Sequence, residues 1–181
     1  VWRVGEIGVP GISDLDFVLG ITPPVSKEQA ESLSIRDLEG AASYISFHQP
    51  LIFGTALLED LFFWGSVSQP VHLWGEKTAF RQMTADDSHW MAIITLNDIF
   101  VQSQPRMLLS TLFSRRMHVR GTLCQINALK HTLRIYRDAT GLSITPWDDF
   151  VTEFSSFRRQ WFTLGEDRIE KLRLYTILAI E

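Results

Sequence analysis

Cysteine is almost missing from this chain, since Cys124 is the single cysteine among 181 residues. One cysteine excludes a disulfide framework and a cysteine zinc cluster within the chain, and it fits a reducing compartment. Lysine is also scarce, because only four of the 17 basic residues are Lys, and the sequence pI is about 5.7. These features disfavour a basic nucleic-acid-binding protein, so we expect no nucleic-acid partner.

Long hydrophobic runs are missing as well. No uncharged apolar run reaches the roughly 20 residues that a membrane-spanning helix needs, and the nearest one, residues 50–64, is interrupted by Glu59 and Asp60. The first residues lack the charged start and apolar stretch of a signal peptide. We therefore expect no membrane partner and a cytoplasmic location. Because the chain begins without Met and stops inside an apolar helical pattern, we also expect it to be part of a larger protein.

Apolar residues are plentiful, and charge is unevenly spread. Six Trp, twelve Phe and a hydrophobic share of 45% exclude a mainly disordered chain and suffice for one large or two small cores. Residues 1–84 hold five basic and ten acidic residues, a net charge of -5, whereas residues 85–181 hold twelve and eleven, a net charge of +1. We therefore expect two domains, 1–84 and 85–181.

The first region mixes predicted strands with short helices. A Gly/Pro-rich turn at 8–11 separates the first two strands. Ser26 is the expected cap of a helix over 26–33, a second helix is expected over 34–42, and residues 51–64 suggest a loop followed by a short helix. The predicted strands are 1–7, 15–21, 44–47 and 70–74.

The second region has a helical pattern. Thr84 and Asp87 have the spacing of a capping box, and Pro105 suits the first residue of the next helix. Apolar residues over 119–136 recur at helical spacing up to Gly141, and Thr145-Pro-Trp-Asp148 opens a helix expected to end at Gly165. A last helix is expected from residue 166. The fold class predicted for the whole chain is α+β.

Two carboxylates follow the first turn. Asp14 and Asp16 are separated by a single residue at the start of the second predicted strand, so their side chains point to one face. Two hard oxygen ligands beside a flexible glycine turn suit a Mg²⁺ that also binds substrate phosphates. The alternative is that one Asp caps the turn while the other faces solvent at a strand edge.

This segment resembles the fingerprint of the nucleotidyltransferase superfamily: an apolar strand, a glycine-containing loop, then Asp-x-Asp flanked by apolar residues. Gly5, Gly11, Ser13, Asp14 and Asp16 match that layout within roughly the first twenty residues. The resemblance implies a mixed-sheet nucleotidyltransferase-like core followed by a helical bundle domain. It also implies that Asp14 and Asp16 bind Mg²⁺ and that the turn containing Gly5, Gly11 and Ser13 lies against the nucleotide phosphates.

The segment departs from the family's pattern at two positions. Glu6 follows Gly5 where the family has Ser or Gly, and Gln49 follows the 44–47 strand where a third carboxylate is expected. An amide binds metal weakly and accepts no proton. Glu76, after the 70–74 strand, is therefore the predicted third catalytic acid beside Asp14 and Asp16, and Asp60 is another choice.

The function implied by the resemblance is Mg²⁺-dependent transfer of a nucleoside monophosphate from an NTP, with ATP expected, to a small molecule or a protein. Glu6 and Gln49 support an alternative, a non-catalytic nucleotidyltransferase-fold module for binding or assembly.

Two further features belong to the second region. Arg115-Arg116 and Arg158-Arg159 are expected to be solvated or ion-paired, with contact to phosphates as the functional alternative. The aromatic stripe of Phe150, Phe154, Phe157 and Trp161 is expected to belong to the core rather than to a base-stacking platform.

Overall fold

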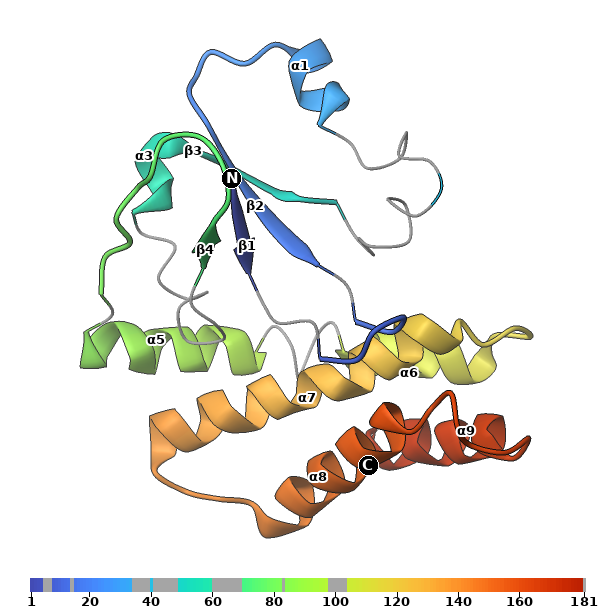
Figure 1. Cartoon of the computed structure of the whole chain (residues 1–181). Coiled ribbons are helices and arrows are strands. Elements are labelled where there is room, and N and C mark those ends of the chain that lie inside the picture. Colours follow the sequence, from blue (N-terminus) through green and yellow to red (C-terminus); the bar gives the residue numbers. More distant parts are fainter. Residues whose placement is uncertain are drawn as a thin grey trace. The chain divides into compact units, whose positions relative to one another are not determined.

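The structure, a computed structural model, describes residues 1–4, 8–13, 15–33, 40, 49–59, 70–82, 84–97 and 104–180. The chain forms two compact units, Val1–Thr84 and Ala85–Glu181. The first contains a four-stranded mixed sheet and short helices, and the second is helical (Figure 1). The α+β class predicted from the sequence is therefore confirmed. Within the described residues, no helix is long and apolar enough to cross a membrane.

The sheet of the first unit has the strand order β3-β2-β1-β4. Strand β1 (Trp2–Val4) pairs antiparallel with β2 (Asp16–Ile21) and with β4 (Val71–His72), whereas β3 (Leu51–Gly54) pairs parallel with β2. The predicted strands at the positions of β2 and β4 are confirmed. The loop predicted at the start of 51–64 is wrong, because its apolar residues Leu51 to Phe53 form β3 against β2.

Helices α1 (Lys27–Ser32) and α3 (Thr55–Leu58) complete the described part of this unit. Ser26 caps α1 as predicted: its Oγ accepts the Gln29 N–H at 3.2 Å, and its own N–H donates to Gln29 Oε1 at 2.9 Å. This reciprocal pair is a capping box with Gln at the third position. The predicted helix at 34–42 and the strand at 44–47 lie outside the described residues, apart from Gly40.

The core of the first unit lies on one face of the sheet. Trp2, Val4 and Val18 are at most 3% exposed, and Leu58 of α3 packs with them. Because Trp2 is directly opposite both Val18 and His72, side chains from three strands share this face. The Trp2 ring meets the rings of His72 and Phe80 edge-on, with centroids 5.6 and 5.8 Å apart.

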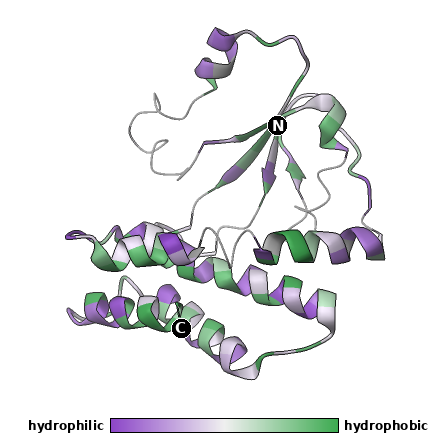
Figure 2. Ribbon diagram, turned by 180° about the vertical axis from the view of Figure 1, so that it is seen from behind, coloured by the Kyte–Doolittle hydropathy of each residue, from purple (hydrophilic) through white to green (hydrophobic). Residues whose placement is uncertain are grey.

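The second unit consists of α5 (Ala85–Leu96), α6 (Gln104–Phe113), α7 (Val119–Thr140), α8 (Thr145–Arg159) and α9 (Arg168–Leu178). Helix α7 contacts the other four (Figure 1). Figure 2 shows that hydrophobic and hydrophilic residues both occur along these helices. The Leu123, Ile126 and Leu129 side chains of α7 are each at most 2% exposed.

The predicted helix boundaries in this unit are mostly confirmed. Gly141 ends α7 with φ 69°, and its N–H donates to Arg137 O at 2.8 Å, a left-handed glycine cap. Pro105 is the second residue of α6 rather than the first. Helix α8 ends at Arg159, earlier than the predicted Gly165, and the Trp161 N–H donates to Arg158 O, three residues back, rather than to the residue four back.

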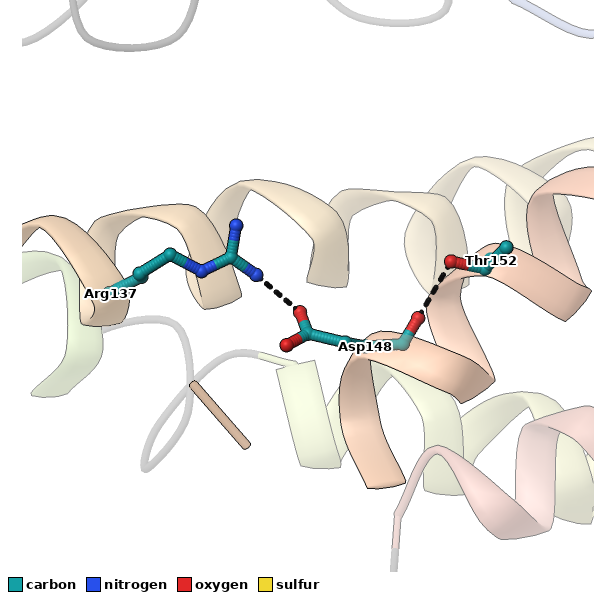
Figure 3. Close-up of polar contacts among 3 residues, drawn as sticks. All are labelled: Arg137, Asp148 and Thr152. Carbon is teal, nitrogen blue, oxygen red and sulfur yellow. Dashed lines mark hydrogen bonds and ion pairs between the residues drawn. The ribbon is translucent and has the colours of Figure 1, made fainter. Parts of the chain in front are cut away.

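Helices α7 and α8 are linked by an ion pair at the turn between them. Arg137 in the last turn of α7 donates from Nη2 to Asp148 Oδ1 in the first turn of α8, and Thr152 Oγ1 donates to Asp148 O at 2.8 Å (Figure 3). Each charge complements the dipole of its own helix end. The pair is half exposed, so its own contribution is at most about 1 kcal/mol.

The aromatic stripe of α8 belongs to the core, as predicted. Phe154, Phe157 and Trp161 are 1%, 7% and 6% exposed, and Tyr175 of α9 lies against the Phe154 and Phe157 rings with centroids 5.2 and 4.8 Å away. The Tyr175 hydroxyl donates to Glu153 Oε1 at 2.6 Å. Burial and this hydrogen bond to a carboxylate raise the pKa of Tyr175 above its usual 10.0.

This shift predicts a loss of stability at high pH. The folded chain keeps the Tyr175 proton at a pH at which the unfolded chain releases it, so the stabilisation is complete below pH 10.0 and declines as the pH rises above it. We expect the free energy of unfolding, measured by urea denaturation between about pH 9 and pH 11, to fall more steeply in the wild type than in Tyr175→Phe. Equal slopes in the two proteins would contradict this account.

Candidate functional site

The predicted site begins at the turn between β1 and β2. Val9 and Ile12 are 7% and 2% exposed and anchor the turn, while Gly11 has φ 81°, a left-handed conformation that suits glycine. The Ile12 and Ser13 N–H groups donate to Val9 O at 3.1 and 2.8 Å. The Gly/Pro turn predicted here is therefore confirmed, and it leads directly to the Asp-containing strand.

Ser13 has a structural role in this turn. Its Oγ accepts the Val9 N–H at 2.9 Å, which closes the turn across its base. Ser13 and Gly11 thus lie between the two strands, where the resemblance places phosphate-contacting residues. Gly5, Glu6 and Asp14 lie outside the described residues.

Asp16 is the described member of the predicted metal-binding pair. It opens β2 directly opposite Val4, so its side chain shares the face of the sheet that carries Val4, Val18 and Trp2. Asp16 is half-buried, and its Oδ1 is buried. A partly buried carboxylate at the end of a strand, next to a glycine turn, is a suitable oxygen ligand for Mg²⁺.

Gln49 lies just before the point where β3 begins to pair with β2. The strands are parallel, with Val18 level with Leu51, and the same register continued by two residues would put Gln49 level with Asp16. Gln49 is exposed. An amide oxygen is a possible but weak metal ligand, and it cannot act as a general base.

Glu76, the predicted third acid, lies at the other end of the sheet. The chain after β4 runs beside Val1: the Trp74 N–H donates to Val1 O at 3.3 Å, and the Val1 amino group donates to Trp74 O at 2.7 Å. Asp16 is opposite Val4, and β1 lies between β2 and β4. Three residues of strand, about 10 Å, and two strand spacings of about 4.8 Å therefore separate Asp16 from Trp74, which lies two residues before Glu76. The structure does not bring Glu76 to Asp16.

The oxygen ligands near Asp16 can be compared with those that a magnesium ion needs. Among the residues that the structure describes, no group of three His, Cys, Asp or Glu side chains converges as a metal cluster. Mg²⁺ in nucleotide sites is commonly held by one or two carboxylates, with phosphates and water supplying the rest. Asp16 supplies one carboxylate of this kind, and Asp14, the other predicted ligand, lies outside the described residues.

Arg158 is more buried than a solvated helix face would leave it. Of the two expectations for this residue, solvated or ion-paired, the first is wrong, because Arg158 is 5% exposed, while Arg159 is exposed. Phe154 lies four residues before it and Phe157 one residue before it, so Arg158 falls within the apolar stripe of α8. This spacing is the feature of the sequence that indicates burial of Arg158.

No family model matches the chain, and no curated protein or solved structure matches it either. The resemblance to nucleotidyltransferases therefore rests on the motif residues alone.

Proposed function

We propose that the first unit binds a nucleoside triphosphate, with ATP expected, through Mg²⁺ on Asp14 and Asp16, and transfers its nucleoside monophosphate to a small-molecule or protein acceptor. The observation that supports this proposal is the β1–turn–β2 arrangement. An ordered glycine turn, closed by Ser13, leads into a strand whose first residue is Asp16. Gly5, Gly11 and Ser13 are the proposed phosphate-contacting residues.

The roles of the chain's own residues follow from their chemistry. Asp14 and Asp16 would hold Mg²⁺, which when bound neutralises phosphate charge. The backbone of the turn is held by hydrogen bonds between Val9 and Ser13. Glu76 follows the end of β4 that lies away from Asp16, so Asp60, which lies outside the described residues, becomes the proposed acid for acceptor activation.

A second candidate is a nucleotidyltransferase-fold module that binds nucleotide without transferring it. Gln49 beside Asp16 favours this candidate, because a neutral amide stands where a base would be most useful. The two candidates share the nucleotide site and differ in the chemical step. Pyrophosphate release from Mg²⁺–NTP, with each small-molecule and protein acceptor tried, distinguishes them. Release that Asp60→Asn abolishes supports the transferase, and binding without release supports the second candidate.

The shared site predicts a ligand-dependent stabilisation. With Mg²⁺, the preferred NTP at a hundred times its dissociation constant adds about 2.7 kcal/mol to the stability of the chain, which raises its melting temperature. We expect Asp14→Asn combined with Asp16→Asn to remove this rise. Glu76→Gln, the same chemical change at the other end of the sheet, serves as the control and keeps it. The proposal fails if no NTP raises the melting temperature or if the double variant keeps the full rise.

A further inference from the structure

A basic stretch lies in the middle of this acidic chain. No Asp or Glu occurs between Asp98 and Asp138, although seven Arg and Lys residues lie there. Three of these, Arg106, Arg115 and Arg116, are exposed. In the part of the chain that the structure describes, their side chains make no ion pair or hydrogen bond. Arg159 on α8 shares this property.

Other cations of the second unit have partners. Arg134 and Arg137 pair with Asp138 and Asp148, and Arg173 pairs with Glu170. Lys171 binds Asp167 at 2.7 Å. The arginines without partners are therefore concentrated at α6 and at the connection that follows it.

Exposed apolar side chains lie among these arginines. Phe113, the last residue of α6, is 84% exposed, and Leu109 is 40% exposed. The spacing of three and four residues puts Arg106, Leu109 and Phe113 on one face of α6. Covering a phenylalanine that is this exposed removes apolar surface from water, which favours binding of a partner.

The connection from α6 to α7 is ordered. The Ser114 Oγ accepts the Arg116 N–H at 3.3 Å and donates to Arg116 O at 2.8 Å, and the Ser114 N–H donates to Thr111 O. This turn keeps Arg115 and Arg116 close to Phe113, because two or three residues span at most about 7–11 Å. Cations thus follow the apolar pair directly and also precede it at Arg106.

We propose that Arg106, Leu109, Phe113, Arg115 and Arg116, here called the α6–α7 surface, bind an acidic segment of another protein that carries an apolar side chain. Charge complementarity selects the acidic residues, which would lie over the arginines at both ends. Leu109 and Phe113 between them need an apolar anchor, which a nucleic-acid backbone lacks. The inference is independent of nucleotide binding by the first unit.

The test uses the whole chain and a short fluorescein-labelled peptide that has Glu residues on both sides of one Leu and one Phe. Fluorescence anisotropy should show binding that weakens as salt rises, since exposed charges are screened over about 8 Å at physiological ionic strength. Arg115→Glu, Arg116→Glu and Phe113→Ser should each weaken binding at least about fivefold, a typical range for contacts at a small charged interface.

Two controls match these changes elsewhere on the second unit. Arg159→Glu reverses the other exposed arginine that lacks a partner, and Phe162→Ser replaces a phenylalanine that is 61% exposed. Both should leave the affinity within about twofold, the small effect expected of side chains outside an interface. Since all these positions are exposed, the variants should keep the wild-type unfolding midpoint.

Several results would overturn the proposal. The first is that the peptide does not bind the wild type. The second is that a peptide with Gln in place of Glu binds as tightly as the Glu peptide. The third is that Arg159→Glu weakens binding as much as Arg115→Glu or Arg116→Glu does. Tighter binding of a single-stranded oligonucleotide, or of phosphatidylserine-containing vesicles, with displacement of the peptide would also overturn it and would assign the surface to that class of partner.

Discussion

Replacing Phe154 by alanine is expected to lower the stability of the second unit by about 3–5 kcal/mol, the range for deleting a buried aromatic ring. Phe154 is 1% exposed and lies at the centre of the aromatic cluster. Its ring meets Tyr175 edge-on at 5.2 Å and stacks near Phe150 at 6.3 Å, while Phe157 is 6.0 Å away. Removing it leaves a cavity between α8 and α9 that these rigid rings fill poorly.

Urea denaturation followed by circular dichroism measures this loss, and hydrogen exchange locates it in α7, α8 and α9. Phe162→Ala is the matched control, since the Phe162 side chain is 61% exposed and little burial is lost with it. A change below about 1 kcal/mol in Phe154→Ala, within the range of surface substitutions, would show that this cluster does not hold the helices together.

Gly20→Ala is expected to destabilise the first unit by about 1–3 kcal/mol, as overpacking of a core does. Gly20 lies in β2 on the face that carries Val18. A Cβ built there would overlap Leu58 Cδ1 and lie 3.2 Å from Trp2 Cζ3. Leu58 is 0% exposed and Trp2 is 3% exposed, so neither side chain has room to withdraw.

Gly54→Ala tests whether the missing space, rather than the substitution itself, is the cause. Gly54 is level with Ile21 at the end of β3, and nothing lies within 4 Å of a Cβ built there. We expect Gly54→Ala to leave the unfolding free energy of the first unit unchanged or slightly higher, because alanine restricts the unfolded chain. Equal destabilisation by the two substitutions would refute the proposed contact with Leu58.

The stability predictions and the functional ones concern separate features of the first unit. Gly20 and Leu58 belong to the core, whereas Asp14 and Asp16 can be changed to Asn with little loss of volume. If the Asp14→Asn and Asp16→Asn double variant unfolds at the wild-type midpoint but no longer responds to NTP, the loss is a loss of binding. If the double variant is also less stable without NTP, Asp16 is instead a structural residue of β2.

Much of the local structure was predictable from the sequence because its causes lie within a few residues. Ser26 and Gln29 supply the two halves of one cap, and Gly141 supplies the left-handed residue that ends α7. The aromatic stripe of α8 has a helical period that alone predicts a buried face. Asp16 follows a glycine turn in the printed sequence, so its place at the start of a strand was predictable too.

Only the tertiary structure decided which of the predicted site residues meet. Whether Leu51 to Phe53 form a loop or a strand depends on the partner strand β2, which lies some thirty residues earlier in the chain. The register of that pairing, continued by two residues, would put Gln49 level with Asp16. The pairing of β1 with its neighbours puts the end of β4, which Glu76 follows, at the opposite end of the sheet from Asp16. Strand pairing is set by non-local burial of apolar faces, so no local pattern specifies it. The sequence determined the carboxylates and the turn, and the packing of the sheet determined their neighbours.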